Sequence, residues 1–175
     1  MDFIDVPLPD MSKQEKILAV SAGAYHCGAL VGIVGHERGG AERILTWGEG
    51  VHGALGHNDE LRREHPTRVD ALEHCHAVQL SMGHEFSACL TTDDRLYMWG
   101  KGNNGQLGNG YYVDSLEPAL AKTPGNNPDI HWVSISCGED HCVGITGDGP
   151  PQFDPNENTF VRERHAKDTA LPTHH

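Results

Sequence analysis

Long apolar runs and secretion signals are missing from this sequence. No stretch of about 18 apolar residues occurs, so no segment is long enough to cross a membrane as a helix. The opening residues, MDFIDVPLPD, lack the basic start and the apolar core of a signal peptide. We therefore expect an intracellular protein of the cytoplasm or nucleus, without membrane insertion.

Clustered positive charge is also scarce. Lysine and arginine total 13 against 25 aspartates and glutamates, which gives a formal net charge of −12. The only basic run lies in the segment LRRE. Nucleic-acid binding depends on clustered cations that displace counterions from phosphate, so we expect no direct nucleic-acid partner. An acidic balance mainly indicates solubility, and it also fits a basic protein partner.

The motifs of catalysis and of cofactor binding are missing as well. There is no Gly-x-Ser-x-Gly elbow and no Gly-x4-Gly-Lys-Ser/Thr loop for phosphate. The five cysteines are irregularly spaced, and no two of them are separated by the two residues typical of zinc sites. His74 and His76 could share an ion, but exposed loop histidines are the preferred interpretation. We expect reduced thiols, no cofactor, no metal and no catalytic residue.

Glycine, in contrast, is abundant, with 21 residues, and it recurs in a pattern. Three segments align without gaps: VSAGAYHCGALV, LSMGHEFSACLT and ISCGEDHCVGIT. Their shared glycines are Gly23, Gly83 and Gly138. His26 and His141 follow three residues after their glycines, and Phe86 takes that place in the middle segment. The shared glycines are 60 and then 55 residues apart, and a motif that recurs at such an interval indicates a repeat architecture.

A second block recurs in phase with the first. It reads TWGEGVHGALGHN and later MWGKGNNGQLGNG. Its matching positions are Trp47 and Trp99, Gly48 and Gly100, Gly53 and Gly105, and Gly56 and Gly108. Phosphate-binding loops do not recur with a tryptophan at their head, whereas structural units do. Glycine allows strands and turns to approach closely and to adopt positive φ, and the indole fills the space between neighbouring sheets.

Each repeat unit predicts four short β-strands. An apolar strand ends at the shared glycine, a second strand follows, a third alternates in polarity and ends at Trp-Gly, and a short fourth contains proline. Four strands in about 50 to 60 residues is typical of a propeller blade. The cysteines of the repeats align with small or apolar residues, so they behave as core residues.

At these two blocks the sequence resembles the repeats of the regulator of chromosome condensation family. Those repeats combine Cys-Gly or Ala-Gly, a histidine three residues on, and Trp-Gly-x-Asn-x-x-Gly-Gln-Leu-Gly. The resemblance covers about residues 17 to 146. It implies a β-propeller, which closes into a ring of blades in complete members.

We therefore expect an all-β, incomplete β-propeller of four-stranded antiparallel blades. The expected divisions are the end of a preceding blade or an arm over 1–16, blade 1 over 17–72, blade 2 over 73–128, a partial blade 3 over 129–149 and a polar, mobile tail over 150–175. Within the tail, NTFVRER could be a decayed third strand. Two and a half blades cannot close a ring, so strand edges and a blade face stay open. A fragment of a longer propeller, a chain completed by a partner and an arc stabilised in an assembly all fit, and marginal stability or self-association is expected.

Candidate binding residues lie on loops, because the repeated histidines and tryptophans have structural explanations. We interpret His26 and His141 as bonding to backbone within their own blades. The long hairpin GHERGGAER and the mixed-charge segment HNDELRREHPTR remain as surfaces for a protein partner. Their candidate residues are His36, Glu37, Arg38, Arg43, Arg62 and Arg63.

These observations favour a non-enzymatic scaffold for protein–protein interaction, as a fragment or a subunit of a larger assembly. Its partners would be proteins, such as a small GTPase or other propeller blades. Two alternatives stay open. The resemblance also implies guanine-nucleotide exchange on a Ras-like small GTPase, which requires a completed propeller, or the repeat region of a ubiquitin ligase.

Overall fold

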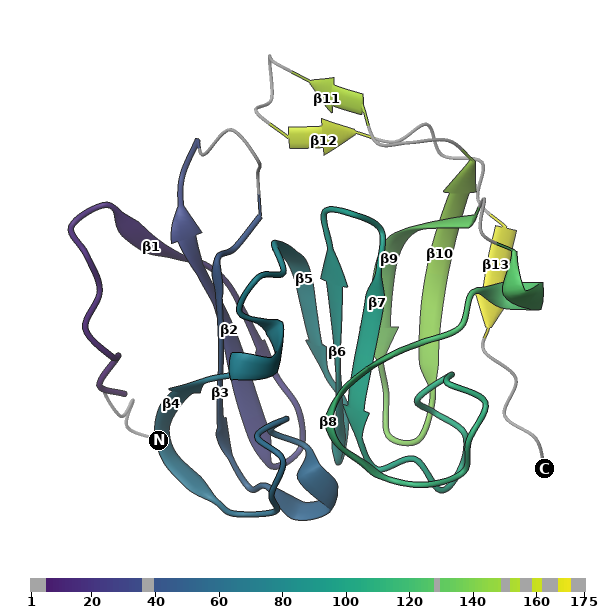
Figure 1. The fold of residues 1–175 in the computed structure, drawn as a ribbon, viewed down its shortest axis with the longest axis horizontal. Coiled ribbons are helices and arrows are strands. Elements are labelled where there is room, and N and C mark those ends of the chain that lie inside the picture. Colours follow the sequence, from purple (N-terminus) through teal and green to yellow (C-terminus); the bar gives the residue numbers. More distant parts are fainter. Residues whose placement is uncertain are drawn as a thin grey trace.

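Three antiparallel sheets stand side by side like the sectors of a fan (Figure 1). The computed structural model describes residues 6–35, 40–127 and 130–148, and three further short strands. Within this part of the chain, no helix is long and apolar enough to cross a membrane.

The first two sheets, here called blade 1 and blade 2, have four strands each in sequence order. Blade 1 consists of β1 (Glu15–Ala22), β2 (His26–Ile33), β3 (Arg43–Gly48) and β4 (Arg63–Arg68). Blade 2 consists of β5 (Ala77–Met82), β6 (Phe86–Thr91), β7 (Leu96–Gly100) and β8 (Ser115–Leu120). Three short 3-10 helices lie between strands: η1 (Val51–Gly53), η2 (Asp70–Leu72) and η3 (Pro124–Asn126). The prediction of four-stranded antiparallel sheets is confirmed.

The third sheet, blade 3, is built differently from the expectation. Its hairpin is β9 (Ile130–Cys137) and β10 (Cys142–Asp148), and β13 (Lys167–Ala170) pairs with the other edge of β10. The segment NTFVRER does not fill that place, because β12 (Thr159–Val161) within it pairs with β11 (Gln152–Asp154). The rest of 150–175, and with it the expected mobility of the tail, lies outside the described residues.

Neighbouring blades meet first through their backbones. The N–H of Ala24 donates to the carbonyl of Gly83 at 3.3 Å, and one blade on, the N–H of His84 donates to the carbonyl of Gly138 at 3.2 Å. A Cβ on Gly23 would lie 2.1 Å from the Gly83 carbonyl oxygen, closer than any side chain tolerates. Glycine is therefore required where one hairpin turn touches the next.

The innermost strands are also linked by serine hydroxyls. Ser21 Oγ on β1 accepts the N–H of Met82 on β5 at 3.0 Å. At the equivalent position of the next blade, Ser81 Oγ accepts the N–H of Cys137 at 2.9 Å. The two blade boundaries are thus made by the same contact.

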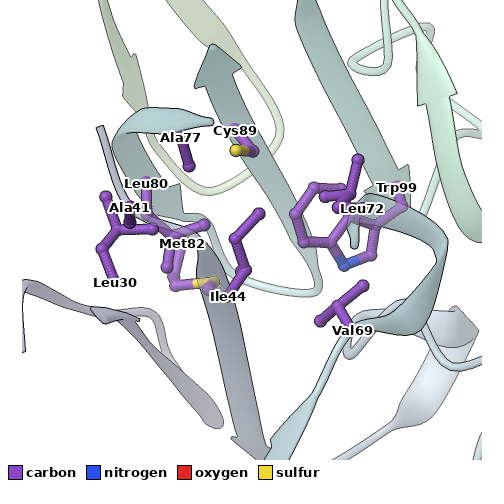
Figure 2. Packing of buried hydrophobic residues seen from close by; sticks show 10 residues of the cluster. All are labelled: Leu30, Ala41, Ile44, Val69, Leu72, Ala77, Leu80, Met82, Cys89 and Trp99. Atoms are coloured by element: carbon purple, nitrogen blue, oxygen red, sulfur yellow. The ribbon is translucent and has the colours of Figure 1, made fainter. Parts of the chain in front are cut away.

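Trp99 closes the space between blades 1 and 2. Its fully buried indole donates Nε1–H to the carbonyl of Ala54 at 2.9 Å, and Ser87 Oγ donates to the same carbonyl at 2.7 Å. Figure 2 shows Trp99 beside η2, within an apolar cluster that both blades supply. The members of this cluster are Leu30, Ala41, Ile44, Val69, Leu72, Ala77, Leu80, Met82, Cys89 and Trp99.

The side chain of His26 does not bond only within its own blade, as the sequence was interpreted to indicate. Its Nε2 lies 2.8 Å from Ser87 Oγ on blade 2. Because the Ser87 hydroxyl proton goes to Ala54, His26 Nε2 carries the proton of a neutral ring. Burial lowers the pKa of His26 to about 4. The sequence did not predict this contact, because the serine is 61 residues away.

Replacing Trp99 by phenylalanine tests the joint between blades. We expect W99F to lower the free energy of unfolding by about 2 kcal/mol, from a lost buried hydrogen bond and a cavity. The matched control is W47F, because Trp47 is only partly buried and its face meets no other described sheet. Urea unfolding followed by circular dichroism measures both, and equal losses would contradict the assigned role of Trp99.

Replacing His26 by phenylalanine, the residue that blade 2 uses at this position, tests the buried neutral ring. Because the pKa falls on folding, the unfolded chain binds more protons between about pH 6.5 and pH 4, and stability declines as the pH falls through that window. From pH 7 to pH 5 this contribution is about 2 kcal/mol, which H26F should lack. Urea unfolding at both pH values measures it, with H141F at the equivalent exposed position as control. An H26F variant that keeps the wild-type pH dependence would rule out the assignment.

Candidate functional site

Several charged residues gather at one end of the sheets. At this end the loops after β3 and β7 fold over the β1–β2 and β5–β6 hairpin turns. Gly100 has a φ of +100°, and a Cβ there would lie 2.6 Å from the carbonyl oxygen of Glu85. This conformation lets the Lys101 N–H donate to the Glu85 carbonyl at 2.9 Å. Blade 1 repeats the bond, from the Glu49 N–H to the Tyr25 carbonyl at 2.9 Å. The residue after each Trp-Gly is thereby held above a turn of its own blade.

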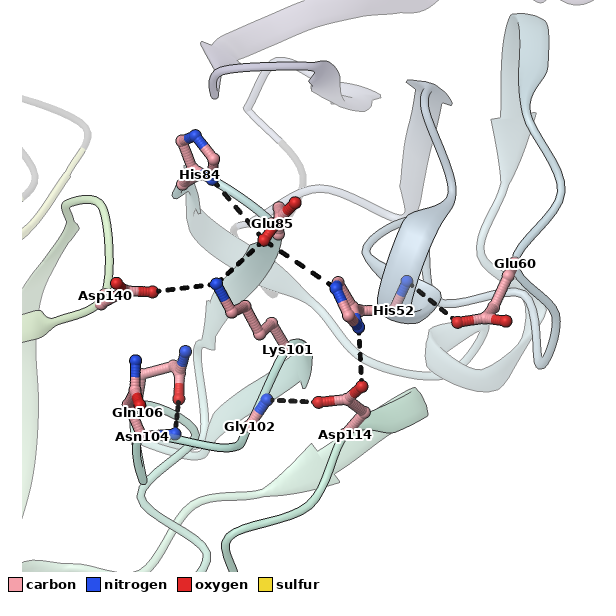
Figure 3. Close-up of polar contacts among 10 residues, drawn as sticks. All are labelled: His52, Glu60, His84, Glu85, Lys101, Gly102, Asn104, Gln106, Asp114 and Asp140. Carbon is pink, nitrogen blue, oxygen red and sulfur yellow. Dashed lines mark hydrogen bonds and ion pairs between the residues drawn. The ribbon is translucent and has the colours of Figure 1, made fainter.

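Lys101 joins blade 2 to blade 3 at this end (Figure 3). Its Nζ lies 3.0 Å from Glu85 Oε2 on its own blade and 3.4 Å from Asp140 Oδ1 on the next. The hydrogen bond from the Lys101 ammonium holds the pKa of the Glu85 carboxyl below its usual value, and the same bond raises the pKa of Lys101. Both groups are therefore charged near neutral pH.

His52 makes the corresponding link between blades 1 and 2. It lies in η1 at a φ of +58°, and its Nδ1 is 2.7 Å from Asp114 Oδ2 while its Nε2 is 3.9 Å from Glu85 Oε2. The other oxygen of Asp114 accepts the Gly102 N–H at 2.9 Å. The backbone N–H of His52 donates to Glu60 Oε1 at 3.1 Å. We call His52, Glu60, Glu85, Lys101, Asp114 and Asp140 the loop-end network.

A hollow of about 360 Å³ lies beside this network at the boundary of blades 1 and 2. Tyr25 is exposed there, and its ring meets the edge of the His84 ring at a centroid distance of 5.1 Å. The lining residues are Tyr25, His26, Glu49, Val51, Ala54, His84 and Glu85. An aromatic ring, small apolar groups and two carboxylates suit the docking of a side chain from a protein.

Two of the arginines predicted from the sequence lie at the rim of this end. Arg62 is exposed, and its guanidinium is 3.2 Å from Glu49. Arg63 forms two bonds of 2.8 Å with the carboxylate of Asp59, and these bonds lower the pKa of Asp59 to about 2. Arg62 thus remains exposed to solvent within its ion pair with Glu49, whereas Arg63 holds its own loop.

The other predicted binding residues do not join them. Arg43 begins β3, and its guanidinium is 2.9 Å from Glu15 on β1, beside a different hollow of about 470 Å³. That hollow is lined by Glu15, Glu42, Arg43, Arg68, Glu73, His74 and His76. His36, Glu37 and Arg38 lie outside the described residues.

Metal-binding groups are not assembled in the described part of the chain. His74 and His76 line one hollow, but no group of three or more His, Cys, Asp or Glu side chains in that part is placed to hold an ion. All five cysteines are free thiols, and the sulfurs of Cys137 and Cys142 are 3.7 Å apart across the β9–β10 hairpin.

The loop-end network was not predicted from the sequence, although the repeat phase carries a signal for it. Lys101 directly follows a Trp-Gly pair, and Glu85 and Asp140 each stand two residues after a shared glycine. Aligning the charges that flank the repeat motifs would have brought these three together. Nothing in the spacing points to His52 or Asp114, whose meeting depends on how the loops of two blades fold.

Comparison with known families agrees with the repeat pattern. A family model described as the regulator of chromosome condensation (RCC1) repeat matches residues 42–90 and 93–145, and a second RCC1 repeat model matches residues 77–106. These matches cover more than half of the chain.

The similarity to known relatives covers only part of the length of each relative. The Ultraviolet-B receptor UVR8 of Arabidopsis thaliana is 30% identical over 162 residues, which are 90% of this chain and 34% of the receptor. The human E3 ubiquitin-protein ligase HERC2 is 31% identical over 144 residues, which are 77% of this chain and 3% of the ligase. This chain therefore spans about a third or less of these relatives.

Solved structures support the same fold. The structure of Prp20p from Saccharomyces cerevisiae superimposes with a TM-score of 0.67 at 17% sequence identity, over 82% of this chain and 33% of Prp20p. The sheets pack as the blades of an incomplete β-propeller. Because the repeat model matches more than half of the sequence, the chain belongs to the regulator of chromosome condensation (RCC1) repeat family.

Proposed function

We propose that this chain is a non-enzymatic module for protein–protein interaction that binds a basic partner through its loop end. The observation that carries this proposal is the loop-end network, in which side chains of three blades hold one another across blade boundaries. Loops on a rigid scaffold are where binding surfaces of folded proteins are most often found.

The network prepares the surface for binding before a partner arrives. Lys101 is fixed between two carboxylates, and His52 is fixed between Asp114 and Glu85. Side chains that are already ordered lose little conformational entropy on association. A partner therefore meets a charge pattern that is set by the protein itself.

The charge of this surface decides the class of partner. Carboxylates outnumber cations among the network and the lining of its hollow, and the whole chain is acidic. Complementary charge speeds encounter and selects among partners. The exposed Tyr25 and Val51 add the apolar contact area that a basic peptide alone would not need. We infer a partner segment that combines lysine or arginine with an apolar residue.

Two other functions have support from relatives. HERC2, a ubiquitin ligase by name, shares 31% identity with this chain, which would make the chain a repeat region that recruits proteins to such an enzyme. The Prp20p structure is described together with its binding to Gsp1p and histones, but that likeness at 17% identity concerns the fold. Nucleotide exchange on a small GTPase would require a completed propeller.

A charge-matched pair of variants tests the basic-partner proposal. A fluorescent peptide of alternating lysine and leucine serves as the probe, and fluorescence anisotropy measures its dissociation constant. Replacing Glu49 and Glu60 by glutamine should weaken binding about threefold to tenfold, because two charges at the surface are lost. The control replaces Glu64 and Glu117, which are exposed on β4 and β8, and changes the net charge equally.

Equal weakening in both double variants would mean that only net charge matters and would overturn the proposed site.

A second assay tests the alternative function, nucleotide exchange on a small GTPase. Release of fluorescent GDP from a panel of Ras-like GTPases should not accelerate in the presence of this chain. Acceleration by the chain alone would contradict the scaffold function.

A further inference from the structure

The two faces of a blade are chemically different, and the repeat shows what each face contacts. We call the face toward the preceding blade the leading face. Leu80 on blade 2 and Ile135 on blade 3 occupy equivalent positions on it, and both are buried against the preceding blade. Val20 takes the same position on blade 1 and is 73% exposed. The leading face of blade 1 is therefore an apolar face that no described sheet covers.

The opposite face, toward the following blade, is the trailing face. Leu30 on blade 1 and Leu90 on blade 2 are buried there in the clusters between blades. Ile145 takes this position on blade 3 and is 36% exposed, and its neighbour Val143 is 40% exposed. Within the described residues, blade 3 thus presents a second open apolar face, of the opposite kind.

The polar parts of the joint are also present at both ends. Trp47 matches Trp99, whose indole N–H reaches a carbonyl of the preceding blade, and among the described residues Trp47 has no such acceptor. Ser136 matches Ser21 and Ser81, whose hydroxyls each accept an N–H from the following blade, and Ser136 is exposed. Each open face carries the groups that the internal joints already use.

We propose that the open leading face of blade 1 receives the open trailing face of blade 3 from a second copy of this chain. A copy carries both halves of the joint, and the same joint is made twice inside each chain. Val20 then packs against Ile145 of the other copy, as Leu80 packs near Leu30 within the chain. This inference does not depend on the loop-end surface, which lies at the ends of the blades.

Such contacts are heterologous, because two different faces meet. A heterologous contact between two copies leaves one face free at each end. Further copies therefore add until the rotation between copies brings the two ends together in a ring, or they form an open chain when it does not. Each copy carries a formal charge of −12, so copies repel one another in dilute buffer. Salt screens this repulsion and should therefore strengthen the association.

Sedimentation velocity of the whole chain tests the proposal. The wild type should form assemblies that grow with protein concentration and with salt. V20E blocks the leading face and V143E blocks the trailing face, so each variant alone should be monomeric. Mixed one to one, they should form a dimer and nothing larger, because each supplies the single face that the other lacks.

The control is V113E, the same apolar-to-acidic change at an exposed site in the β7–β8 loop of blade 2, outside both open faces. It should assemble like the wild type, and circular dichroism verifies that all variants are folded. A wild type that stays monomeric up to about 100 µM in high salt would overturn the proposal. So would dimers of V143E alone, because they would require two leading faces to meet.

Discussion

One contact sets the distance between neighbouring blades. In it, the carbonyl of a shared glycine touches the hairpin turn of the preceding blade. At Gly23 there is no room for even a methyl group against the Gly83 carbonyl, and the same closeness recurs between Gly83 and Gly138. This approach brings Ser21 within reach of the next inner strand. The wider outer space between blades 1 and 2 is then filled by Trp99 and the cluster around it. Glycine and tryptophan recur together because one allows the contact at the inner strands and the other fills the remaining space.

The charged loop end is a consequence of the same geometry. Because the turns of successive blades touch, carboxylates on those turns fall within reach of one lysine, as Lys101 shows with Glu85 and Asp140. In blade 1 the residue equivalent to Lys101 is Glu49, so the first boundary offers carboxylates and an aromatic ring where the second has an internal cation. One scaffold therefore carries a closed charge pair at one boundary and an open acidic hollow at the other.

Much of the fold could be predicted from the sequence, and the exceptions share a cause. The strands, their order and the burial of Trp99 follow from periodicity within one repeat. The bond from His26 to Ser87 could not be predicted, because it depends on the rotation between two sheets. The pairing of β13 with β10 escaped prediction because a free strand edge accepts any extended segment within reach, whatever its side chains. Contacts within a blade are thus encoded locally, and contacts between blades are not.

Amide hydrogen exchange in two serine variants tests most directly whether the blade boundaries are equivalent joints. The Met82 N–H depends on Ser21, and the Cys137 N–H depends on Ser81. Ser21→Ala should speed exchange at Met82 about tenfold and leave Cys137 unchanged, and Ser81→Ala should do the reverse, because each removes one hydrogen bond at one boundary. Exchange that is unchanged in both variants, or faster at both amides in each, would contradict a molecule built from repeated, separate joints.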